Sequence, residues 1–138
     1  MSSTPGYSKT PLAKKLGIKN GYYIFLKNAP SHYWKLFDLL PEDIQIIESP
    51  KPESVDFIHL FCINQKDLLD NAKNCKTYLR KNGTFWISWP KGASKISSDL
   101  KREPIRDHLL EIGLVDTKVA AIDEDWSGLK FMYRIKNR

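Results

Sequence analysis

The sequence predicts one α/β domain built around a mostly parallel sheet. Continuous aromatic and β-branched runs of strand length, bounded by turn residues, indicate strands that are buried on both faces. Segments of helical periodicity alternate with these runs, and this order favours parallel strands joined by right-handed crossovers. The length of 138 residues suits a single domain, and the content of 41% hydrophobic and 28% charged residues is ordinary for a globular protein.

The beginning of the chain predicts a tail followed by a short docking helix. Residues 1–10 are small, polar and turn-forming, which is typical of a flexible tail, so we expect the domain to cover residues 11–138. Pro11 and Gly17 mark the start and the stop of a helical turn. Its two leucines are four residues apart and would dock the turn on the domain.

Six strands and three further helices follow. We expect the helices over residues 32–39, from Asn64 to Asn82-Gly83, and over residues 103–112. The middle helix has an apolar face at helical spacing, made of Leu68, Leu69, Ala72, Cys75, Tyr78 and Leu79. We expect the strands over residues 22–26, 44–47, 55–62, 84–89, 114–122 and 128–135.

The order of these elements also predicts how the sheet ends. The connection through residues 123–127 is too short for a parallel crossover, so the last strand should run antiparallel to its neighbour. A parallel sheet that ends in an antiparallel hairpin resembles the class I methyltransferase variant of the Rossmann fold, here shortened by one β-α unit after the second strand. The resemblance implies a three-layer Rossmann-like domain with the strand order 2-1-3-4-6-5 and an antiparallel sixth strand.

The net charge of +6 is concentrated at the two ends of the chain. Residues 1–20 carry four lysines and no acid, and the last five residues carry three basic side chains, while the rest is almost neutral. A nucleic-acid-binding protein usually gathers its basic residues on one face. Solvated basic ends therefore explain the charge better than a nucleic-acid partner does.

Cysteine and histidine usage points to a reducing compartment and to no metal site. Cys62 and Cys75 lack CxxC spacing and lie in apolar surroundings, so we expect both in the core. His32, His59 and His108 are widely separated, and His59 should be a satisfied core histidine because its strand is apolar. The chain shows neither a hydrophobic signal region nor a stretch of membrane-spanning length. We expect a cytoplasmic protein with no membrane partner, no metal and no cofactor.

The candidate site follows from topology. Open α/β sheets bind ligands at the carboxyl ends of their strands, near the point where the strand order reverses. Parallel strands bring the loops after the first, third, fourth and fifth strands to one edge, together with the hairpin turn. The candidate ligand-binding residues on that edge are Asn28, Trp89, Lys91, Ser94, Asp123, Trp126 and Ser127.

A cation and two tryptophans are the strongest of these candidates. Lys91, the flexible Gly92 and the hydroxyl of Ser94 could together hold a carboxylate or a phosphate. Trp89 and Trp126 could stack on a planar ligand. The alternatives are a solvated loop lysine and tryptophans that only cover the edge of the sheet.

The acidic turn and the end of the first strand are weaker candidates. Asp123, Glu124 and Asp125 could pair with Lys91 or accept a proton, although turn formation and solvation explain them better. Asn28 could present its amide at the switch point, and its alternative role is to cap the next helix. No catalytic residue is assigned.

The usual cofactor and nucleophile motifs do not occur. The sequence contains no GxSxG, P-loop, HExxH or GxGxxG pattern. The first strand ends in Asn28-Ala29-Pro30, where a methyltransferase usually carries glycines that let the backbone approach the cofactor. Proline also removes a backbone N–H at this turn. This departure weighs against ordinary S-adenosylmethionine binding and leaves room for a different ligand in the same crevice.

The chain also resembles a bacterial family of small proteins catalogued only as a domain of unknown function. The resemblance covers nearly everything from residue 10 onward. It implies a bacterial, cytosolic protein with a truncated Rossmann-like fold, and it supplies no activity or catalytic residue. The stretches that carry it are residues 10–18 (TPLAKKLGI), 28–30 (NAP), 55–61 (VDFIHLF), 86–91 (WISWPK), 113–131 and the basic helix between the last two.

Three functional hypotheses are consistent with these observations. The leading one is a noncatalytic protein, or one that binds a small anionic molecule at the carboxyl ends of its strands. The second is a degenerate S-adenosylmethionine-dependent methyltransferase-like enzyme. The third is a protein-interaction module that docks through its basic N-terminal segment.

Overall fold

The computed structural model describes residues 11–138, and the expected tail, residues 1–10, lies outside the described part. The helices are α1 (Leu12–Leu16), α2 (Gln65–Tyr78) and α3 (Arg102–Glu111), with two 3₁₀ turns, η1 (Tyr33–Leu36) and η2 (Ile135–Asn137). The strands are β1 (Tyr23–Lys27), β2 (Gln45–Ile46), β3 (Val55–Phe61), β4 (Leu79–Pro90), β5 (Leu114–Ala121) and β6 (Trp126–Tyr133).

The six strands form one sheet in the order β2-β1-β3-β4-β6-β5, as the sequence predicts. β1 pairs in parallel with β2 and β3, and β3 pairs in parallel with β4. β6 runs antiparallel to both of its neighbours, β4 and β5. The domain is therefore the shortened, methyltransferase-like Rossmann sheet with a terminal antiparallel hairpin.

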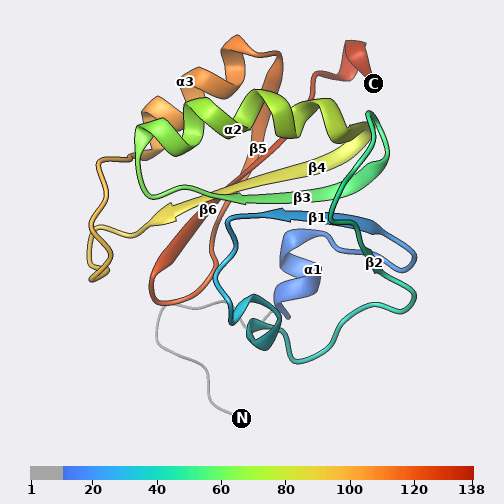
Figure 1. Ribbon diagram of the computed structural model, residues 1–138, viewed down its shortest axis with the longest axis horizontal. Helices are drawn as coiled ribbons and strands as arrows, with labels where there is room; N and C mark the ends of the chain where they lie inside the picture. The colour runs from blue at the N-terminus through green and yellow to red at the C-terminus, as the bar shows by residue number, and fades with distance from the viewer. Residues whose placement is uncertain (1–10) are drawn as a thin grey trace.

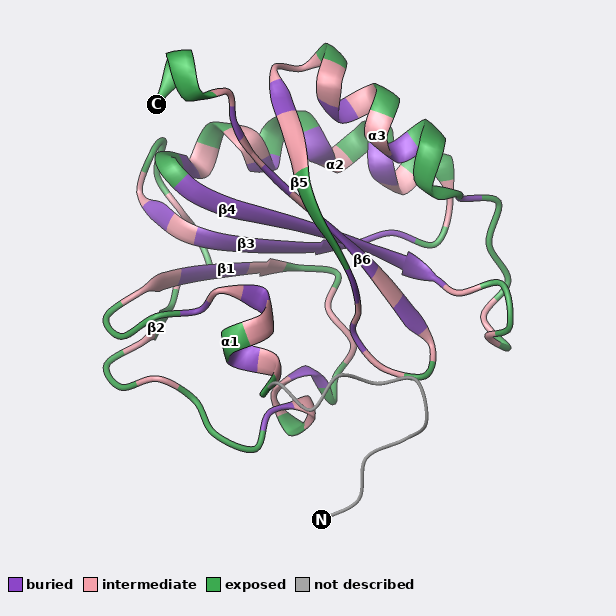
Figure 2. Cartoon of the chain, turned by 180° about the vertical axis from the view of Figure 1, so that it is seen from behind, coloured by how far each residue is buried: buried purple, intermediate pink, exposed green. Residues whose placement is uncertain are grey.

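The sheet is the middle of three layers. α2 and α3 lie on one face, while α1 and η1 lie on the other (Figure 1). Each face has its own apolar core, and the sheet lies between the two. Successive side chains of the central strands point alternately into one core and the other. Nearly all of β3 and the second half of β4 are buried, whereas the middle of the edge strand β5 is exposed (Figure 2).

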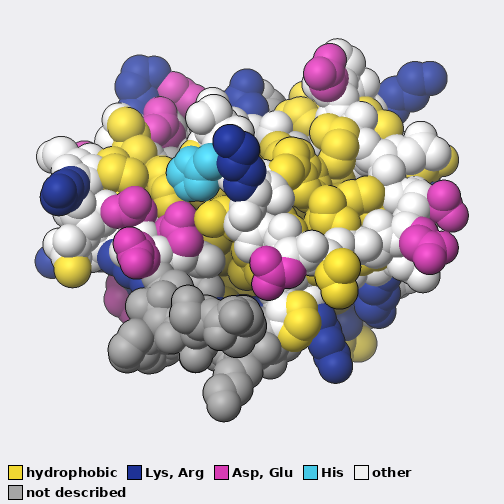
Figure 3. All heavy atoms as spheres, turned by 90° about the horizontal axis from the view of Figure 1, so that it is seen from below, with side chains coloured by type: hydrophobic (Ala, Val, Ile, Leu, Met, Phe, Trp, Pro, Cys, Tyr) yellow, Lys and Arg dark blue, Asp and Glu magenta, His cyan; other side chains and the backbone are white. Residues whose placement is uncertain are grey.

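α1 is part of the domain rather than a detached arm. Leu16 is fully buried, and the indole Nε1–H of Trp86 in β4 donates a hydrogen bond to its carbonyl oxygen at 2.8 Å. Lys15 Nζ donates to the carbonyl of Ala121 at 2.8 Å, which ties the helix to the end of β5. Figure 3 looks onto the face that carries α1 and η1, where hydrophobic side chains gather with charged ones around them. No helix within residues 11–138 is long and apolar enough to cross a membrane.

The predicted cap of α2 is confirmed, but the prediction that Leu69 belongs to the buried apolar face of this helix is wrong. Asn64 Oδ1 accepts a hydrogen bond from Asp67 N at 2.8 Å, so it caps the helix as expected. Leu68 is buried against the sheet, whereas Leu69 is 57% exposed. Leu69 lies one residue beyond the stripe that faces the sheet, and it is left in solvent because a single sheet covers only one side of the helix.

The expected stop of α2 at Asn82-Gly83 is wrong. The helix ends at Tyr78, and β4 begins at the next residue. The pairing with β3 jumps from Val55–Leu79 to Phe57–Thr84, so residues 80–83 bulge out of the ladder. Gly83 sits within this bulge, and a Cβ there would lie only 2.5 Å from Leu79 Cδ1. The glycine therefore allows a close approach within the strand instead of ending a helix.

The expected helix over residues 32–39 is instead the single 3₁₀ turn η1. Pro41 disfavours helical backbone at the residue before it, and so short a helix is marginal without strong packing. Tyr33 is drawn into the core, where its hydroxyl reaches His59. Phe37 is already in extended conformation, so the chain leaves the turn after one round.

Candidate functional site

The carboxyl end of β4 and the β5–β6 turn lie on one edge of the sheet, as the topology predicts. Pro90 pairs with Trp126 at the end of the antiparallel ladder. The backbone N–H of Lys91 donates to the carbonyl of Asp125 at 2.8 Å. Lys91 and Trp126, which stand in different elements of the sequence, are thus held at the same edge.

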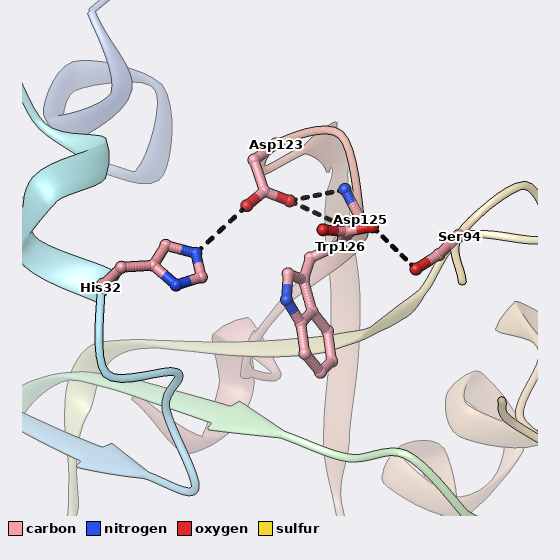
Figure 4. A network of polar contacts seen from close by, with 5 residues as sticks. All are labelled: His32, Ser94, Asp123, Asp125 and Trp126. Carbon is pink, nitrogen blue, oxygen red and sulfur yellow. Dashed lines mark hydrogen bonds and ion pairs between the residues drawn. The ribbon is translucent and has the colours of Figure 1, made fainter. Parts of the chain in front are cut away.

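A chain of polar contacts connects three loops on this edge (Figure 4). His32, just before η1, has its Nε2 3.6 Å from Asp123 Oδ2. The other carboxylate oxygen of Asp123 accepts hydrogen bonds from the backbone N–H of Asp125 at 2.8 Å and of Trp126 at 2.9 Å. Ser94 Oγ donates to Asp125 Oδ1 at 2.9 Å. The acidic turn therefore acts as a structural bracket between the loop after β1 and the loop after β4.

The three acidic residues that were predicted as one cluster make different contacts in the structure. Asp123 and Asp125 each satisfy turn or loop groups, so turn formation, the alternative reading of the sequence, describes both. Glu124 is exposed at the tip of the turn. Lys91 contacts this turn through its backbone, since its N–H donates to the carbonyl of Asp125.

A groove of about 540 Å³ lies between the end of β4 and the start of α3. We call it the β4–α3 groove. Its walls combine basic, hydroxyl and apolar side chains with one glycine, and they are Trp89, Pro90, Lys91, Gly92, Ser94, Ile96, Ser97, Ser98, Leu100, Lys101 and Arg102. Among residues 11–138, the ionisable residues of this lining are all basic, so the groove is suited to an anion.

The predicted site residues separate into two groups across the sheet. Trp89, Lys91 and Ser94 line the β4–α3 groove, on the side of α2 and α3. Trp126 packs in the other core, edge-on to Phe61 with ring centroids 5.0 Å apart. Neighbouring strand residues point to opposite faces, and Trp126 pairs with Pro90, the residue after Trp89. The two tryptophans therefore do not form one stacking surface, and they are 8% and 7% exposed.

Asn28 and Ser127 lie outside the β4–α3 groove. Asn28 follows β1 with a φ of 59°, a left-handed conformation that asparagine tolerates better than most residues. It is exposed and marks the sharp turn into Ala29-Pro30. Ser127 is half-buried in β6, where it pairs with Trp89 and Ala121.

Aromatic side chains pack over the switch point between β1 and β3. Tyr33 lies edge-on to Phe61, the last residue of β3, with ring centroids 5.7 Å apart. Trp126 contacts the same phenylalanine, and all three side chains are buried. The crevice in which this class of sheet usually binds a cofactor is therefore bordered by packed aromatic rings and by the Asn28-Ala29-Pro30 turn.

His59 is a satisfied core histidine, as the sequence predicts. Its Nδ1 lies 2.9 Å from Tyr33 Oη, and its Nε2 lies 2.7 Å from Ser88 Oγ. All three side chains are buried, and the imidazole stacks on Phe61 with ring centroids 4.3 Å apart. Burial lowers the pKa of His59 to about 3 and raises the pKa of Tyr33, so both groups are neutral at pH 7.

The two cysteines are core residues, as expected. Both Cys62 and Cys75 are free and buried, and burial raises the pKa of each thiol to about 12. Neither is therefore a reactive thiolate. Within residues 11–138, no three histidine, cysteine or acidic side chains come together in a way that could hold a metal ion.

Sequence reasoning missed the residues on the far wall of the groove. Ser97 and Ser98 and the basic pair Lys101 and Arg102 line it, at the start of α3. A signal was present, because a serine- and lysine-rich loop precedes the helix that carries Pro104 in its first turn. His32 was also missed, since its partner Asp123 is far away in the sequence.

Comparison with known proteins defines the fold. No family model and no curated protein matches the sequence. Solved structures do match its fold. A SAM-dependent methyltransferase from Aquifex aeolicus superposes with a TM-score of 0.56 at 12% identity, over 89% of this chain and 88% of that one. A TehB-like SAM-dependent methyltransferase from Corynebacterium glutamicum gives 0.58 at 9% identity, over 94% and 90%.

A third match is a ribosomal protein L11 methylase from Lactobacillus delbrueckii subsp. bulgaricus, with a TM-score of 0.58 at 13% identity, over 94% of this chain and 83% of that one. The chain has a methyltransferase-like Rossmann fold. At these identities the similarity shows the fold alone. The resemblance to a small bacterial family of unknown function is confirmed for its fold and otherwise stays a prediction.

Proposed function

We propose that this protein binds a small anionic ligand in the β4–α3 groove, at the carboxyl end of β4. The observation that carries the proposal is the lining of the groove, in which Lys91, Lys101 and Arg102 are the only ionisable residues from the described part of the chain. A volume of about 540 Å³ is within the range of small-molecule sites. Guanidinium and ammonium groups beside hydroxyls are the usual partners of phosphate and carboxylate oxygens.

The environment of Arg102 is compatible with this role. Its Nε lies 3.5 Å from Glu103 Oε1, and both side chains are more than half exposed. Such a surface ion pair contributes little stability, so Arg102 can turn toward a ligand at small cost. Arg102 and Lys101 also stand at the N-terminal end of α3, where the helix dipole favours negative charge.

Titration calorimetry with inorganic phosphate and pyrophosphate at low ionic strength tests the proposal. Replacing both Lys101 and Arg102 by glutamine should weaken binding by about tenfold or more, since each charged hydrogen bond contributes about 1.5 kcal/mol or more. The control is Lys73→Gln with Lys95→Gln, which removes the same charge from two exposed residues outside the groove. Equal losses in the two double variants would show only a general charge effect and would reject the site.

A degenerate methyltransferase-like role is the second candidate, and the fold similarity favours it. Two features argue against S-adenosylmethionine binding. The Asn28-Ala29-Pro30 turn has no glycine that would let its backbone approach a cofactor, and the buried ring of Tyr33 packs beside it. Calorimetry with S-adenosylmethionine separates the two candidates. We expect no heat of binding from S-adenosylmethionine under conditions in which pyrophosphate binds.

The cell location and the partners follow from the same proposal. We infer a cytoplasmic protein whose partner is a small anionic molecule, with neither nucleic acid nor a membrane involved. The hypothesis of a docking module concerns the basic N-terminal segment, and this segment includes α1, whose Leu16 is buried in the domain core. Removing residues 1–20 would therefore delete core side chains as well as charge.

A further inference from the structure

A second hollow lies beside the β4–α3 groove. This hollow, of about 350 Å³, is lined by Ile63, Asn64, Ser97, Ser98 and Asp99, and we call it the α2 hollow. Ser97 and Ser98 belong to both linings, so the two spaces are neighbours at these residues. A ligand anchored in the groove would have to reach past these two serines to enter the α2 hollow.

The groove and the α2 hollow carry opposite charges. Lys91, Lys101 and Arg102 line the groove, whereas Asp99 is the one ionisable residue among positions 11–138 that lines the α2 hollow. Leu100, which stands between Asp99 and Lys101 in the sequence, is buried and anchors this segment in the core. Its two neighbours line different spaces: the carboxylate of Asp99 lines the α2 hollow, and the cation of Lys101 lines the β4–α3 groove.

Asp99 is exposed, and one hydrogen bond holds it in place. Its Oδ1 accepts a hydrogen bond from the backbone N–H of Gln65, the first residue of α2, at 2.9 Å. Within residues 11–138 no basic side chain forms an ion pair with it. At this end of α2, Asn64 and Asp67 accept from the N–H groups of Asp67 and Ile63, and Asp99 is a further acceptor beside them.

We infer that the ligand is a small zwitterion, with a phosphate or carboxylate in the β4–α3 groove and an ammonium group in the α2 hollow. The inference rests on the proposed anion site and adds the class of the ligand. A cationic amine would pair with Asp99 and donate to the side-chain oxygen of Asn64 or Ser97, whereas a neutral tail would form no ion pair with this carboxylate. A partly exposed ion pair of this kind favours the amine about two- to fivefold.

Two phosphate monoesters of nearly equal size test the inference, namely O-phosphoethanolamine and n-propyl phosphate. Calorimetry should show O-phosphoethanolamine binding about threefold tighter or more to the wild-type chain. Asp99→Asn should remove this preference and leave n-propyl phosphate binding unchanged, since an asparagine oxygen can still accept from Gln65 N. Asp70→Asn, a charge change on the exposed side of α2, is the matched control and should keep the preference.

The outcomes separate the inference from the proposal on which it rests. Equal affinity of the two esters for the wild-type chain, or a preference that survives Asp99→Asn, overturns the zwitterion and leaves the anion site intact. If neither ester binds, both are overturned. If both bind and Lys101→Gln with Arg102→Gln weakens them equally, the anion site stands and the Asp99 variant decides the rest.

Discussion

Ser94 and Asp125 are joined by a hydrogen bond of 2.9 Å from Oγ to Oδ1, and this bond fastens the lining of the β4–α3 groove to the β5–β6 turn. Ser94 Oγ also accepts from Ile96 N at 3.1 Å, so one hydroxyl shapes its own loop and anchors it. The shape of the groove therefore depends on an acidic turn that does not line it. Three elements far apart in the sequence, the loop after β1, the loop after β4 and the hairpin, act on one site.

Ser94→Ala should weaken pyrophosphate binding about threefold to tenfold and change the melting temperature little. The lost hydrogen bonds lie in a half-exposed loop and contribute roughly 1 kcal/mol. Their loss should therefore loosen the wall of the groove locally and leave the rest of the domain folded. Ser54→Ala is the control, because it removes a hydroxyl bond to Lys51 O at the opposite end of the sheet. Calorimetry and thermal melts measure both effects, and equal binding by the two variants would contradict the bracket role.

The buried histidine predicts acid sensitivity. The folded pKa of His59 is about 3, whereas an unfolded histidine titrates near 6.5, so only the unfolded chain binds this proton between those values. The free energy of unfolding should fall by about 1.4 kcal/mol for each pH unit below about 6 from this group alone. Above pH 7 the histidine is neutral in both states and contributes no slope.

His59→Gln tests this dependence, because glutamine can bond both hydroxyl partners without titrating. Urea unfolding between pH 4 and pH 7 should give a shallower pH slope for this variant. Ser88→Ala is the matched control. It removes one partner of His59 and should cost about 1–3 kcal/mol at every pH, but it keeps the slope, since burial is the cause of the lowered pKa. Parallel slopes for the wild-type chain and His59→Gln would refute the assignment.

The comparison of His59 with Trp126 shows what the sequence could and could not predict. The apolar run of β3 predicted a buried strand, and burial alone made a satisfied core histidine the better interpretation. Strand order followed from connection lengths in the same way. The face on which Trp126 points depends instead on the pairing of β4 with β6, which no local pattern reveals.

Long-range contacts explain the remaining differences. The helix expected around Tyr33 does not form, and the Tyr33 hydroxyl instead contacts His59, 26 residues away in the sequence. Gly83 looks like a helix stop in the sequence, but in the structure it lies in a bulge next to the carbonyl of Asp56. The edge that carries the candidate site was predictable from topology. Its basic wall at Lys101 and Arg102 was not, because the groove exists only once α3 is docked against β5.

Gly83→Ala should destabilise the domain by about 1–3 kcal/mol. The new Cβ would lie 2.5 Å from Leu79 Cδ1 and 3.0 Å from the carbonyl oxygens of Arg80 and Asp56, and the two backbone atoms cannot move without disturbing the bulge. Gly92→Ala provides the control for stability, since a Cβ there meets nothing within 4 Å. Urea unfolding of both variants measures the difference. A loss no larger for Gly83→Ala than for Gly92→Ala would show that the bulge relaxes freely.

Trp86→Phe should release α1 from the sheet. The substitution leaves the buried carbonyl of Leu16 without its donor and opens space beside it, which together should cost about 2–4 kcal/mol. Trp34→Phe is the matched control, because this indole is only half-buried beside Tyr33 and should cost about 1 kcal/mol or less. Unfolding followed by circular dichroism gives the total loss. Limited proteolysis after Lys14 and Lys15 reports α1 itself, and cleavage no faster than in the wild-type chain would show that Trp86 does not hold the helix.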